Sequence, residues 1–579
     1  MMNKLWKLKA PGNDNDISEI SRLLNVENII ANLLVQRGIK TFNDAKKFFR
    51  PDLNDLHDPF LMKDMNRAVD RINRAIKNNE RILVYGDYDV DGTTAVALLY
   101  SFFRDRYTNI DFYIPDRYTE GYGISFQGID YAHQNGCTLV IALDCGIKAL
   151  DKIKYATHHR IDFIVCDHHT PGDEIPRAVA ILDPKRHDCD YPYKHLSGCG
   201  VGYKLLQAYS QKNNIPKHEI DIYLDLICVS IASDIVPMTG ENRILMYHGL
   251  LLLNKNPGPG LLSIIRTSGL EGKEITVNDI VFKIAPIINA AGRIESGKKA
   301  VELLISATDD FAGKAVGEMN SFNMTRKDFD RTITEEARKI IDENEELQKR
   351  KSTVLFKSDW HKGIIGIVAS RLTEFYYRPT VIMTESNGYA TGSARSVEGY
   401  DLYKAVDSCS DLLENYGGHM YAAGLTMKLE NIEKFSERFE DYVSRSILEE
   451  QLTPFIEIDN EISFDDITPK FYRVLKQFAP FGPSNMSPLF ITRNVTDYGK
   501  GKLVGKTSDH LKMDLMQNDD KNKVIPAIAF NLGENFKFVE KRIPFDICYH
   551  LVENEFLGKT NLQLYIKDIK LSQCGEAGD

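Results

Sequence analysis

The sequence has no long apolar run and no ordered cysteine pattern. No stretch approaches the roughly 18 apolar residues that a membrane span requires, so we expect no membrane association. The basic start, MMNKLWKLKAPGNDND, has no apolar segment behind it and does not predict a secretory signal. The nine cysteines are scattered, odd in number and without a CxxC pair. We therefore expect reduced thiols and a cytoplasmic location rather than a disulfide framework.

Basic residues are also in deficit. The chain carries 72 Lys and Arg against 82 Asp and Glu, a formal net charge of −10. A surface for nucleic acid should be basic, so this balance counts against such a ligand. Buried metal-binding aspartates would lower the sum while cations line a groove elsewhere, so only a specific site can decide. The absence of a GxGxxG motif disfavours a dinucleotide site.

The length of 579 residues predicts several domains. Apolar runs alternate with helical patterns between about 80 and 240, which is typical of a parallel α/β sheet. Short alternating runs beyond Pro454 indicate a small β-barrel. We predict an N-terminal helical region (1–78), a parallel-sheet catalytic domain (79–320), a long connector helix (321–351), a second α/β domain (352–452) and a C-terminal barrel (453–579).

Five apolar runs in the first α/β segment close on, or are followed by, an aspartate. In open α/β sheets, ligands bind just beyond the carboxyl ends of the strands. Several of these acids should therefore share one crevice. They are Asp87, Asp116, Asp144, Asp167 and Asp183.

The segment GDYDVDGTTA (86–95) places three carboxylates within five residues. Two carboxylates about 4 Å apart repel by roughly 4 kcal/mol at an effective dielectric of 20, so a cation must offset the charge. Hard divalent metals prefer oxygen ligands. A solvated turn is one alternative, and a calcium-binding EF-hand loop is another. The EF-hand fit fails because its twelfth position is Leu98 and a strand precedes the loop.

Further metal-ligand types follow along the chain. Asp144 closes IALDCGI, Asp167-His168-His169 close IVCDHHT, and Asp234 ends an apolar helical pattern before Pro237. Alone, Asp234 would be read as a helix cap. Two metals about 3.5–4 Å apart can activate water and steady a leaving oxygen in phosphoryl hydrolysis. The residues therefore predict metal-assisted hydrolysis and leave the substrate open.

In their order, these motifs resemble those of the DHH phosphoesterases. GDYDVDGTT, which has Asp87 where the smaller members have His, is similar to the RecJ family. The resemblance extends over roughly 40–575, whereas the first 35 or so residues carry no interpretable signal. Its further segments are IPDRYTEGYG, LSGCGVGYKL, APIINAAGRIES, WHKGIIGIVASRLTEFYYRPT, GSARS, GGHMYAAG and FAPFGPSNMSPLF.

The resemblance implies a DHH catalytic domain, a DHHA1 substrate-binding domain and a C-terminal OB-fold. It also implies two Mn²⁺ or Mg²⁺ ions, with Asp144 bridging them, Asp167 supporting the site and His169 contacting the scissile phosphate. The implied catalytic residues are Asp144, His168 and His169. The implied metal ligands are Asp87, Asp89, Asp91, Asp144, His168 and Asp234.

Substrate contacts are implied in the same way. Arg395 lies in GSARS, where small residues let backbone amides approach an anion that the guanidinium also binds. A surface arginine in a loop is the alternative for Arg395 and for Arg293. The implied substrate-binding residues, including those for a 5′-terminal phosphate, are Arg117, His169, Arg293, Ser393, Arg395, Gly418 and His419.

Cations with interleaved aromatics on the barrel suit single-stranded nucleic acid. A solvated strand face is the alternative reading, and the OB-fold of the family favours binding. These residues are Arg493, Tyr498, Lys500, Lys502, Lys506, His510 and Lys512.

The family implies a monomeric 5′→3′ exonuclease specific for single-stranded DNA. It would release 5′-mononucleotides in DNA repair and recombination, beside partners such as a helicase and a single-strand-binding protein. One alternative is a DHH phosphodiesterase acting on short oligoribonucleotides or cyclic dinucleotides, but those enzymes lack the barrel. Another is a non-catalytic DNA-binding scaffold, but such proteins lose ligands, and every acid position is intact here.

Overall fold

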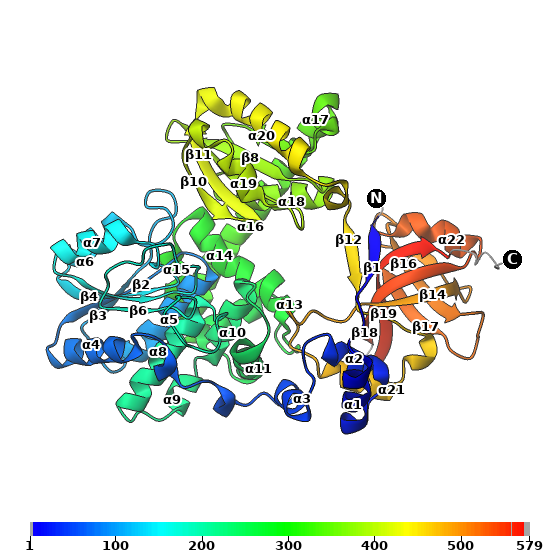
Figure 1. Cartoon of the computed structure of the whole chain (residues 1–579), viewed down its shortest axis with the longest axis horizontal. Coiled ribbons are helices and arrows are strands. Elements are labelled where there is room, and N and C mark those ends of the chain that lie inside the picture. Colours follow the sequence, from blue (N-terminus) through cyan, green and yellow to red (C-terminus); the bar gives the residue numbers. More distant parts are fainter. Residues whose placement is uncertain (1–3, 557–558, 573–579) are drawn as a thin grey trace. The chain divides into compact units, whose positions relative to one another are not determined.

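The computed structural model describes residues 4–556 and 559–572 and divides them into two compact units (Figure 1). Unit 1 comprises Asp55–Val236 and Gly240–Pro454. Unit 2 comprises Lys4–Asn54, Pro237–Thr239 and the residues from Phe455 onward. Within the described ranges, no helix has the length and apolar character to cross a membrane.

The first sheet of unit 1 is fully parallel, with strand order β3-β2-β4-β5-β6. Its strands are almost entirely buried, as expected when helices cover both faces. This confirms the parallel α/β prediction, because each predicted apolar run forms one strand. The strands are β2 (Arg81–Gly86), β3 (Ile110–Tyr113), β4 (Cys137–Leu143), β5 (Asp162–Cys166) and β6 (Ala180–Leu182).

Helices cover both faces of this sheet (Figure 1). One face packs on α6 (Phe126–Gln134) and α7 (Leu150–His158). The other packs on α5 (Val90–Arg104) and α8 (Gly198–Lys212), and α4 (Met65–Lys77) packs on β6.

Behind α5 lies an all-helical layer. Its central helix, α10 (Leu224–Ser233), packs against α5, α8 and α11 (Gly240–Lys255) and is buried except for its C-terminal turn. The remaining helical elements are α9 (His218–Asp221), α12 (Pro259–Thr267), α13 (Val277–Asp279), a π-helical turn (Ile280–Ile284), α14 (Ala285–Ile294) and α15 (Gly297–Leu304).

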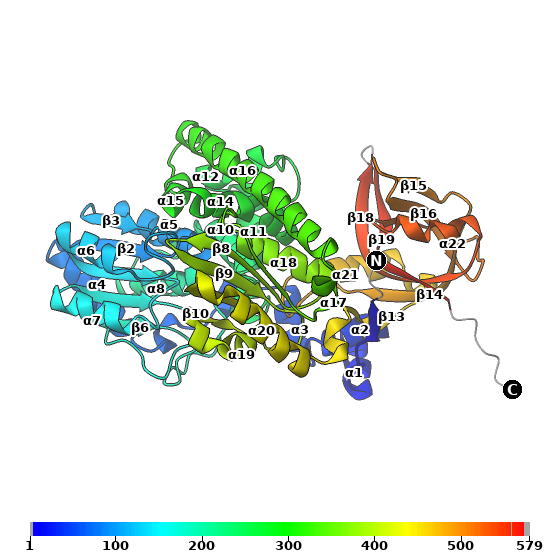
Figure 2. The same cartoon turned by 90° about the horizontal axis from the view of Figure 1, so that it is seen from above.

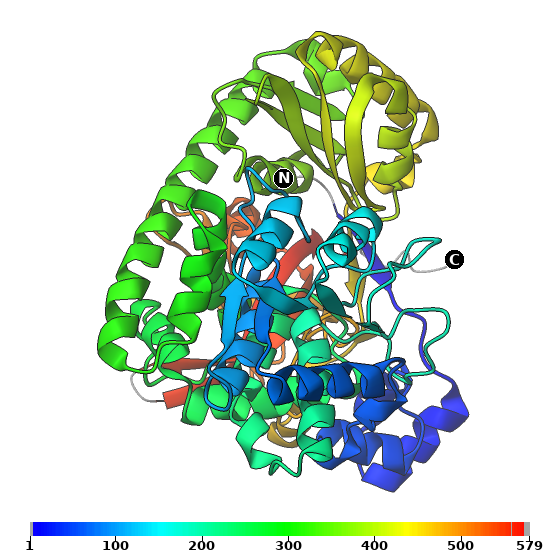
Figure 3. The same ribbon diagram turned by 90° about the vertical axis from the view of Figure 1, so that its left-hand side faces the viewer.

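A long helix, α16 (Asp309–Asp342), links the helical layer to the second sheet, and Figure 3 shows it as the long green ribbon. The predicted connector was 321–351, so the helix starts earlier and ends earlier. Gly313 and Gly317, which weaken a helical pattern, are accommodated inside it on exposed turns. The helix ends before Asn344, whose side chain caps the start of α17 (Glu345–Lys349).

The second sheet of unit 1 is mixed, with order β10-β11-β9-β8-β7. Helices α16 and α18 (Ile365–Tyr376) cover one face, while α19 (Leu402–Asp407) and α20 (Ile432–Ser446) cover the other. This confirms the predicted second α/β domain as a fold. The strands are β7 (Thr353–Phe356), β8 (Thr380–Ser386), β9 (Tyr389–Arg395), β10 (Leu413–His419) and β11 (Ala422–Lys428).

Unit 2 contains the predicted barrel (Figure 2). Its seven-stranded sheet closes because β14 pairs with both β18 and β16. One short helix, α22 (Phe536–Glu540), packs into its core. The strands are β13 (Asn460–Glu461), β14 (Phe490–Asp497), β15 (Lys502–Val504), β16 (His510–Gln517), β17 (Ile525–Ala529), β18 (Phe545–Phe556) and β19 (Lys559–Leu571).

The predicted N-terminal region, 1–78, does not form one body, because Lys4–Asn54 belongs to unit 2 and α4 to unit 1. A strand that the sequence did not reveal, β1 (Leu5–Leu8), pairs in parallel with β12 (Phe455–Ile458). The apolar faces of the N-terminal helices join the barrel core beside α21. These helices are α1 (Asp14–Leu24), α2 (Asn28–Val35), α3 (Phe42–Phe49) and α21 (Pro469–Lys476).

Candidate metal centre and substrate site

The carboxyl ends of the parallel strands carry a group of acids around one imidazole. We name as the acid cluster Asp87, Asp89, Asp91, Asp144, Asp234 and His168. The turns after β2, β4 and β5 supply most of its members, and the end of α10 supplies Asp234. His168 lies within 4 Å of three of these acids, which are Asp91, Asp144 and Asp234.

His168 lies at the centre of the acid cluster. Its Nε2 is 3.1 Å from Asp144 Oδ1, 3.5 Å from Asp234 Oδ2 and 3.7 Å from Asp91 Oδ2. Two groups of potential ligand atoms result, and both contain His168. One adds Asp144 and His169, and the other adds Asp91 and Asp234. Within the described residues, no other group of three or more His, Cys, Asp or Glu side chains could hold a metal.

The backbone brings these side chains unusually close. Asp144 has a φ of 60°, a conformation uncommon for a residue with a side chain. The start of α8 packs directly on it, since a Cβ on Gly198 would lie 2.7 Å from Asp144 Oδ1. The start of α5 likewise packs on Asp87, because a Cβ on Gly92 would lie 2.4 Å from the Asp87 carbonyl oxygen. Glycine is required at both positions.

Burial and mutual repulsion disfavour the charged form of these acids. Burial raises the pKa of Asp144 well above its ordinary value, and the charges of Asp91 and Asp89 add to the effect. Burial, followed by the charges of Asp91 and Asp89, also raises the pKa of Asp234 to about 8. Burial also raises the pKa of Asp87, where Asp89 contributes the largest charge effect. Such a group calls for compensating positive charge.

The donor atoms fit divalent metal ions. Asp87 Oδ2, Asp144 Oδ1 and both ring nitrogens of His168 are buried and have no hydrogen-bond partner. Buried polar atoms are rarely left in that state unless they bind an ion or water. Burial lowers the pKa of His168 to about 4, so its ring is neutral near pH 7 and can offer a lone pair.

Asp91 also accepts hydrogen bonds from α8 and α10. Its Oδ2 accepts a hydrogen bond from Gly198 N (2.6 Å), and its Oδ1 accepts from Cys199 N (2.8 Å) and from Ser230 Oγ (2.7 Å). The carboxylate thus satisfies the N-terminus of α8 while facing His168. A carboxylate oxygen accepts two hydrogen bonds or ligands, so Asp91 can do both.

Asp167 supports its neighbours, as the resemblance implied. Its Oδ2 accepts from Ile147 N at 2.8 Å, and its Oδ1 lies 2.7 Å from His169 Nδ1. Burial acts to raise the pKa of Asp167, but hydrogen bonding and the charge of His169 outweigh it and hold the pKa below its usual range. Burial acts to lower the pKa of His169, but Asp167 raises it to about 9.

His169 is the exposed member of the histidine pair. Its side chain is 42% exposed, and its Nε2 lies 3.2 Å from the Tyr122 hydroxyl. The ring is therefore held at Nδ1 by Asp167, while Nε2 lies beside the Tyr122 hydroxyl.

Four arginines lie near one another, and within the described residues none of them forms an ion pair. We name them the arginine cluster: Arg117, Arg293, Arg326 and Arg395. Burial, followed by the charges of the other three, lowers the pKa of Arg293 to about 10. Burial alone lowers the pKa of Arg395. Half-buried cations without an ion-pair partner favour an anionic ligand.

Local contacts position the arginine cluster. Arg395 Nη1 donates to Ser393 Oγ at 2.9 Å, and Gly366 at the start of α18 packs against both side chains. Arg293 Nη1 donates to Gly363 O at 3.1 Å, which joins the helical layer to the second α/β domain. Arg117 lies over the Tyr88 ring at 4.3 Å.

Gly418 and His419 end β10 at the exposed edge of the second sheet. Gly418 has a φ of 155° and packs so tightly on β11 that a Cβ would lie 2.3 Å from Ala422 O. His419 Nδ1 accepts from Tyr421 N at 3.3 Å. Within the described residues, no hydrogen bond or ion pair joins His419 to the acid cluster, so its substrate role stays a prediction.

Sequence reasoning missed Ser230 and Arg326, whereas it named Asp183 and Asp116 among the strand-end acids. Ser230 holds Asp91 and lies one helical turn before Asp234, a spacing that could have revealed it. Asp183, one of the five strand-end acids, has a buried Oδ2 without a partner, and burial raises its pKa to about 7. Arg326 gave no signal, because it is one of many charges on α16. Asp116 only caps a turn, accepting from Tyr118 N and Thr119 N.

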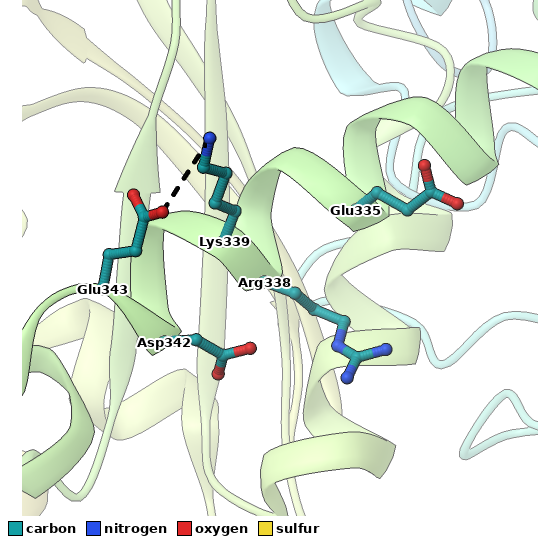
Figure 4. A pocket seen from close by; sticks show the side chains of 5 residues that line it. All are labelled: Glu335, Arg338, Lys339, Asp342 and Glu343. Carbon is teal, nitrogen blue, oxygen red and sulfur yellow. Dashed lines mark ion pairs between the residues drawn. The ribbon is translucent and has the colours of Figure 1, made fainter.

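A separate hollow lies on the last turns of α16 (Figure 4). Lys339 forms an ion pair with Glu343 there at 3.8 Å, and both side chains are about two-thirds exposed or more. Exposed pairs of this kind contribute little, and the hollow contains no predicted site residue. It is lined by Glu335, Arg338, Lys339, Asp342 and Glu343.

Comparison with known proteins identifies the family. The chain is 34% identical to the single-stranded-DNA-specific exonuclease RecJ of Bacillus subtilis, over 98% of this chain and 71% of that protein. The chain belongs to the RecJ family. It is also 28% identical to the RecJ of Escherichia coli, over 93% and 95% of the two chains.

Three family models match successive parts of this RecJ-family chain. They are the DHH family N-terminal domain (81–231), the DHHA1 domain (350–445) and the RecJ OB domain (458–568). These matches confirm the predicted fold classes, including the OB-fold.

Solved RecJ structures resemble this one and contain metal. The Thermus thermophilus RecJ in complex with Mn²⁺ matches with a TM-score of 0.84 and 25% identity, over 98% of this chain and 80% of that one. An exonuclease RecJ bound to manganese matches at 31% identity and a TM-score of 0.59, over 68% and 97% of the chains. The residues of the acid cluster fit the same kind of ion.

Proposed function

We propose that this chain is a metal-dependent exonuclease that degrades single-stranded DNA from its 5′ end and releases 5′-mononucleotides. The observation that carries the proposal is the acid cluster, in which buried carboxylate and imidazole atoms without hydrogen-bond partners lie together at the strand ends. The relatives named RecJ are single-strand-specific exonucleases, which supports the substrate class.

In this proposal the acid cluster, including Asp144, would hold two ions of Mn²⁺ or Mg²⁺. Such ions supply Lewis-acid activation of water and neutralise charge on the phosphate. Asp167 fixes the ring of His169 through Nδ1, which leaves Nε2 to donate to the scissile phosphate. His168 and Asp144 complete the catalytic set.

The arginine cluster, with Ser393, holds the 5′-terminal phosphate. A terminal phosphate carries nearly two negative charges near neutral pH, so a group of arginines favours a strand end over an internal phosphate. The 5′ polarity comes from the family. Gly418 and His419 approach the strand from the second α/β domain. In this scheme residues 79–320 catalyse, 352–452 bind substrate, and the barrel of 453–579 binds the single strand.

The proposed setting is the cytoplasm, where the chain acts as a monomer in DNA repair and recombination beside a helicase and a single-strand-binding protein. A DHH phosphodiesterase acting on short oligoribonucleotides is not favoured, because the RecJ OB domain is present.

The deciding test compares strands labelled at either end, with and without a 5′ phosphate, in Mn²⁺. We expect stepwise loss from the 5′ end, faster with the phosphate, and slow cleavage of a dinucleotide in parallel. Asp144→Ala should abolish hydrolysis, while Asp151→Asn on the exposed start of α7 should not. Degradation from the 3′ end, or retained activity in Asp144→Ala, would reject the assignment.

A further inference from the structure

The chain between β3 and α6 in unit 1 contributes to both parts of the proposed site, and we name residues 114–125 the site loop. Gly123 N donates to Asp87 Oδ1 at 3.1 Å, so the loop contacts the acid cluster. The same loop carries Arg117, a member of the arginine cluster. A shift of the site loop would therefore disturb a proposed metal ligand and a proposed phosphate ligand together.

One carboxylate closes the site loop. Glu120 Oε1 accepts from Asp116 N at 2.8 Å, and Glu120 Oε2 accepts from Ser125 Oγ at 2.5 Å. The Tyr113 hydroxyl, at the end of β3, donates to these two oxygens at 2.9 and 3.0 Å. Hydrogen bonds to an ionised acceptor are stronger than those between neutral groups. Donors from both ends of the loop thus meet on a single side chain.

Two glycines make the segment after Glu120 costly to order. Gly121 has a φ of 86° and Gly123 a φ of 80°, in a region that glycine enters readily. Glycine also loses more conformational freedom on folding than any other residue. The segment between Glu120 and Gly123 therefore needs a fixed point close by, and the hydrogen bonds of Glu120 provide one.

Glu120 acts on its own loop rather than on a ligand. Its charge would repel a phosphate, and three donors already occupy its two oxygens. Within the described residues Glu120 forms no ion pair, so it does not neutralise Arg117, which lies three positions before it. The guanidinium is left for an anion, while the carboxylate fixes the chain that carries it.

We propose that Glu120 is a positioning residue: by closing the site loop, it directs Arg117 toward the 5′-terminal phosphate and Gly123 N toward Asp87. It touches neither the strand nor a metal, and it acts through these two neighbours. This inference rests on the proposed function, since it takes Arg117 as a phosphate ligand and Asp87 as a metal ligand.

The experiment measures kcat/KM in excess Mn²⁺ on single strands with and without a 5′ phosphate, and the ratio of the two values is the phosphate preference. Glu120→Ala should lower kcat/KM on the phosphorylated strand about 100-fold, the scale of a misplacement of about 1 Å. The phosphate preference should fall toward 1, because Arg117 no longer faces the strand end. A loss of folded protein alone would lower both values equally and leave the preference unchanged.

Binding of Mn²⁺ to the full-length protein gives a second readout, with the free ion measured by electron paramagnetic resonance. Without the fixed contact from Gly123 to Asp87, Glu120→Ala should bind Mn²⁺ about 10-fold more weakly, the usual scale for losing a partner behind a ligand. Glu120→Gln keeps the size of the side chain and one acceptor oxygen. It should restore most of the phosphate preference and of the Mn²⁺ affinity.

The matched control is Glu440→Ala in the second α/β domain. Glu440 is half-buried like Glu120, and it accepts from Lys351 N at 3.0 Å, from Ser352 N at 2.9 Å and from Ser444 Oγ at 2.6 Å. This variant should have a lower melting temperature, with wild-type phosphate preference and wild-type Mn²⁺ affinity.

Tyr113→Phe tests the same contact with little risk to folding, because the ring that stacks on Tyr85 is kept. It should lower the phosphate preference about 3-fold, the scale of one hydrogen bond. Wild-type phosphate preference and Mn²⁺ affinity in both Glu120→Ala and Tyr113→Phe would overturn the inference. A wild-type protein that binds no Mn²⁺, or that degrades both strands equally well, would overturn the proposed function and this inference with it.

Discussion

At the scale of single residues, the acid cluster depends on glycines, because helix starts pack closer to Asp87 and Asp144 than a Cβ would permit. The start of α8 supplies two N–H groups to Asp91 and at the same time packs on Asp144. Helix N-termini favour negative charge, so α8 stabilises one acid while its glycine leaves room for the other.

Gly198→Ala should therefore lower kcat by about 100-fold, because a Cβ 2.6 Å from Asp144 Cβ must displace that ligand. The matched control is Gly200→Ala in the same turn, whose Cβ would come no closer than 3.3 Å to another atom. Circular dichroism should show both variants folded. Equal activity in the two variants would mean that the contact at Asp144 is unimportant.

Asp225, in the first turn of α10, predicts a pH dependence of stability. Burial raises its pKa to about 6, against hydrogen bonds from Gly258 N and Leu226 N. A carboxyl with a raised folded-state pKa contributes stability below its unfolded pKa and loses that contribution as pH rises through about 6. From pH 4 to pH 7 the wild type should lose up to about 3 kcal/mol relative to Asp225→Asn. Urea unfolding of both proteins at each pH measures the difference, and parallel curves would contradict the prediction.

At the scale of elements, α8 and α11 are joined by a buried ion pair. Lys204 Nζ lies 2.6 Å from Glu241 Oε1, and both side chains are at most 1% exposed. Glu241 also accepts from the Tyr191 hydroxyl and from His57 N. A buried network of this kind is costly to break at one member, because it leaves a charge unpaired.

Lys204→Met should lower the free energy of unfolding by about 3–5 kcal/mol, because Glu241 then stays buried without its cation. The double variant Lys204→Met, Glu241→Gln should recover part of the loss. Chemical denaturation of the three proteins measures both effects. A loss below 1 kcal/mol in Lys204→Met would show that Glu241 is readily resolvated.

Sequence patterns best predicted the elements whose apolar residues form one uninterrupted pattern. The parallel strands were predictable because each is a short apolar run that ends near an acid. The ends of α16 were not, because Gly313 and Gly317 interrupt the pattern without interrupting the helix. The proposed ligands Asp144, His168 and Asp234 could be predicted from the ends of strands and of a helix. Arg326 could not, because only the fold brings it near three arginines that are distant in the sequence. Strand β1 was not predicted, because its four residues are too few to show an alternation of apolar and polar side chains.

At the scale of the whole molecule, the barrel presents cations of two kinds. Arg493 pairs with Glu461 and Asp546, so it stabilises the barrel rather than standing free for a ligand. Lys502 and Lys512 are exposed and lie opposite each other on β15 and β16. Like charges in that register are unfavourable unless an anion lies near.

Lys512→Ala should weaken binding of a long single strand and reduce the slope of log affinity against log salt by about 0.7, the value for one phosphate contact. Dinucleotide hydrolysis should not change. Fluorescence anisotropy at several salt concentrations gives the slope. Arg493→Ala, by contrast, should lower the melting temperature and leave the slope unchanged; an unaltered slope in Lys512→Ala would remove the barrel face from the DNA path.

The parallel pairing of β1 with β12 has a consequence for synthesis of the chain. At about 5–20 residues per second, Phe455 is made roughly 20–80 s after residue 54. Throughout that interval the apolar faces of the first three helices lack their barrel, while all of unit 1 is being made and can fold. The segment Lys4–Asn54 thus waits for the residues that complete its core, which makes it a client for a chaperone at the ribosome.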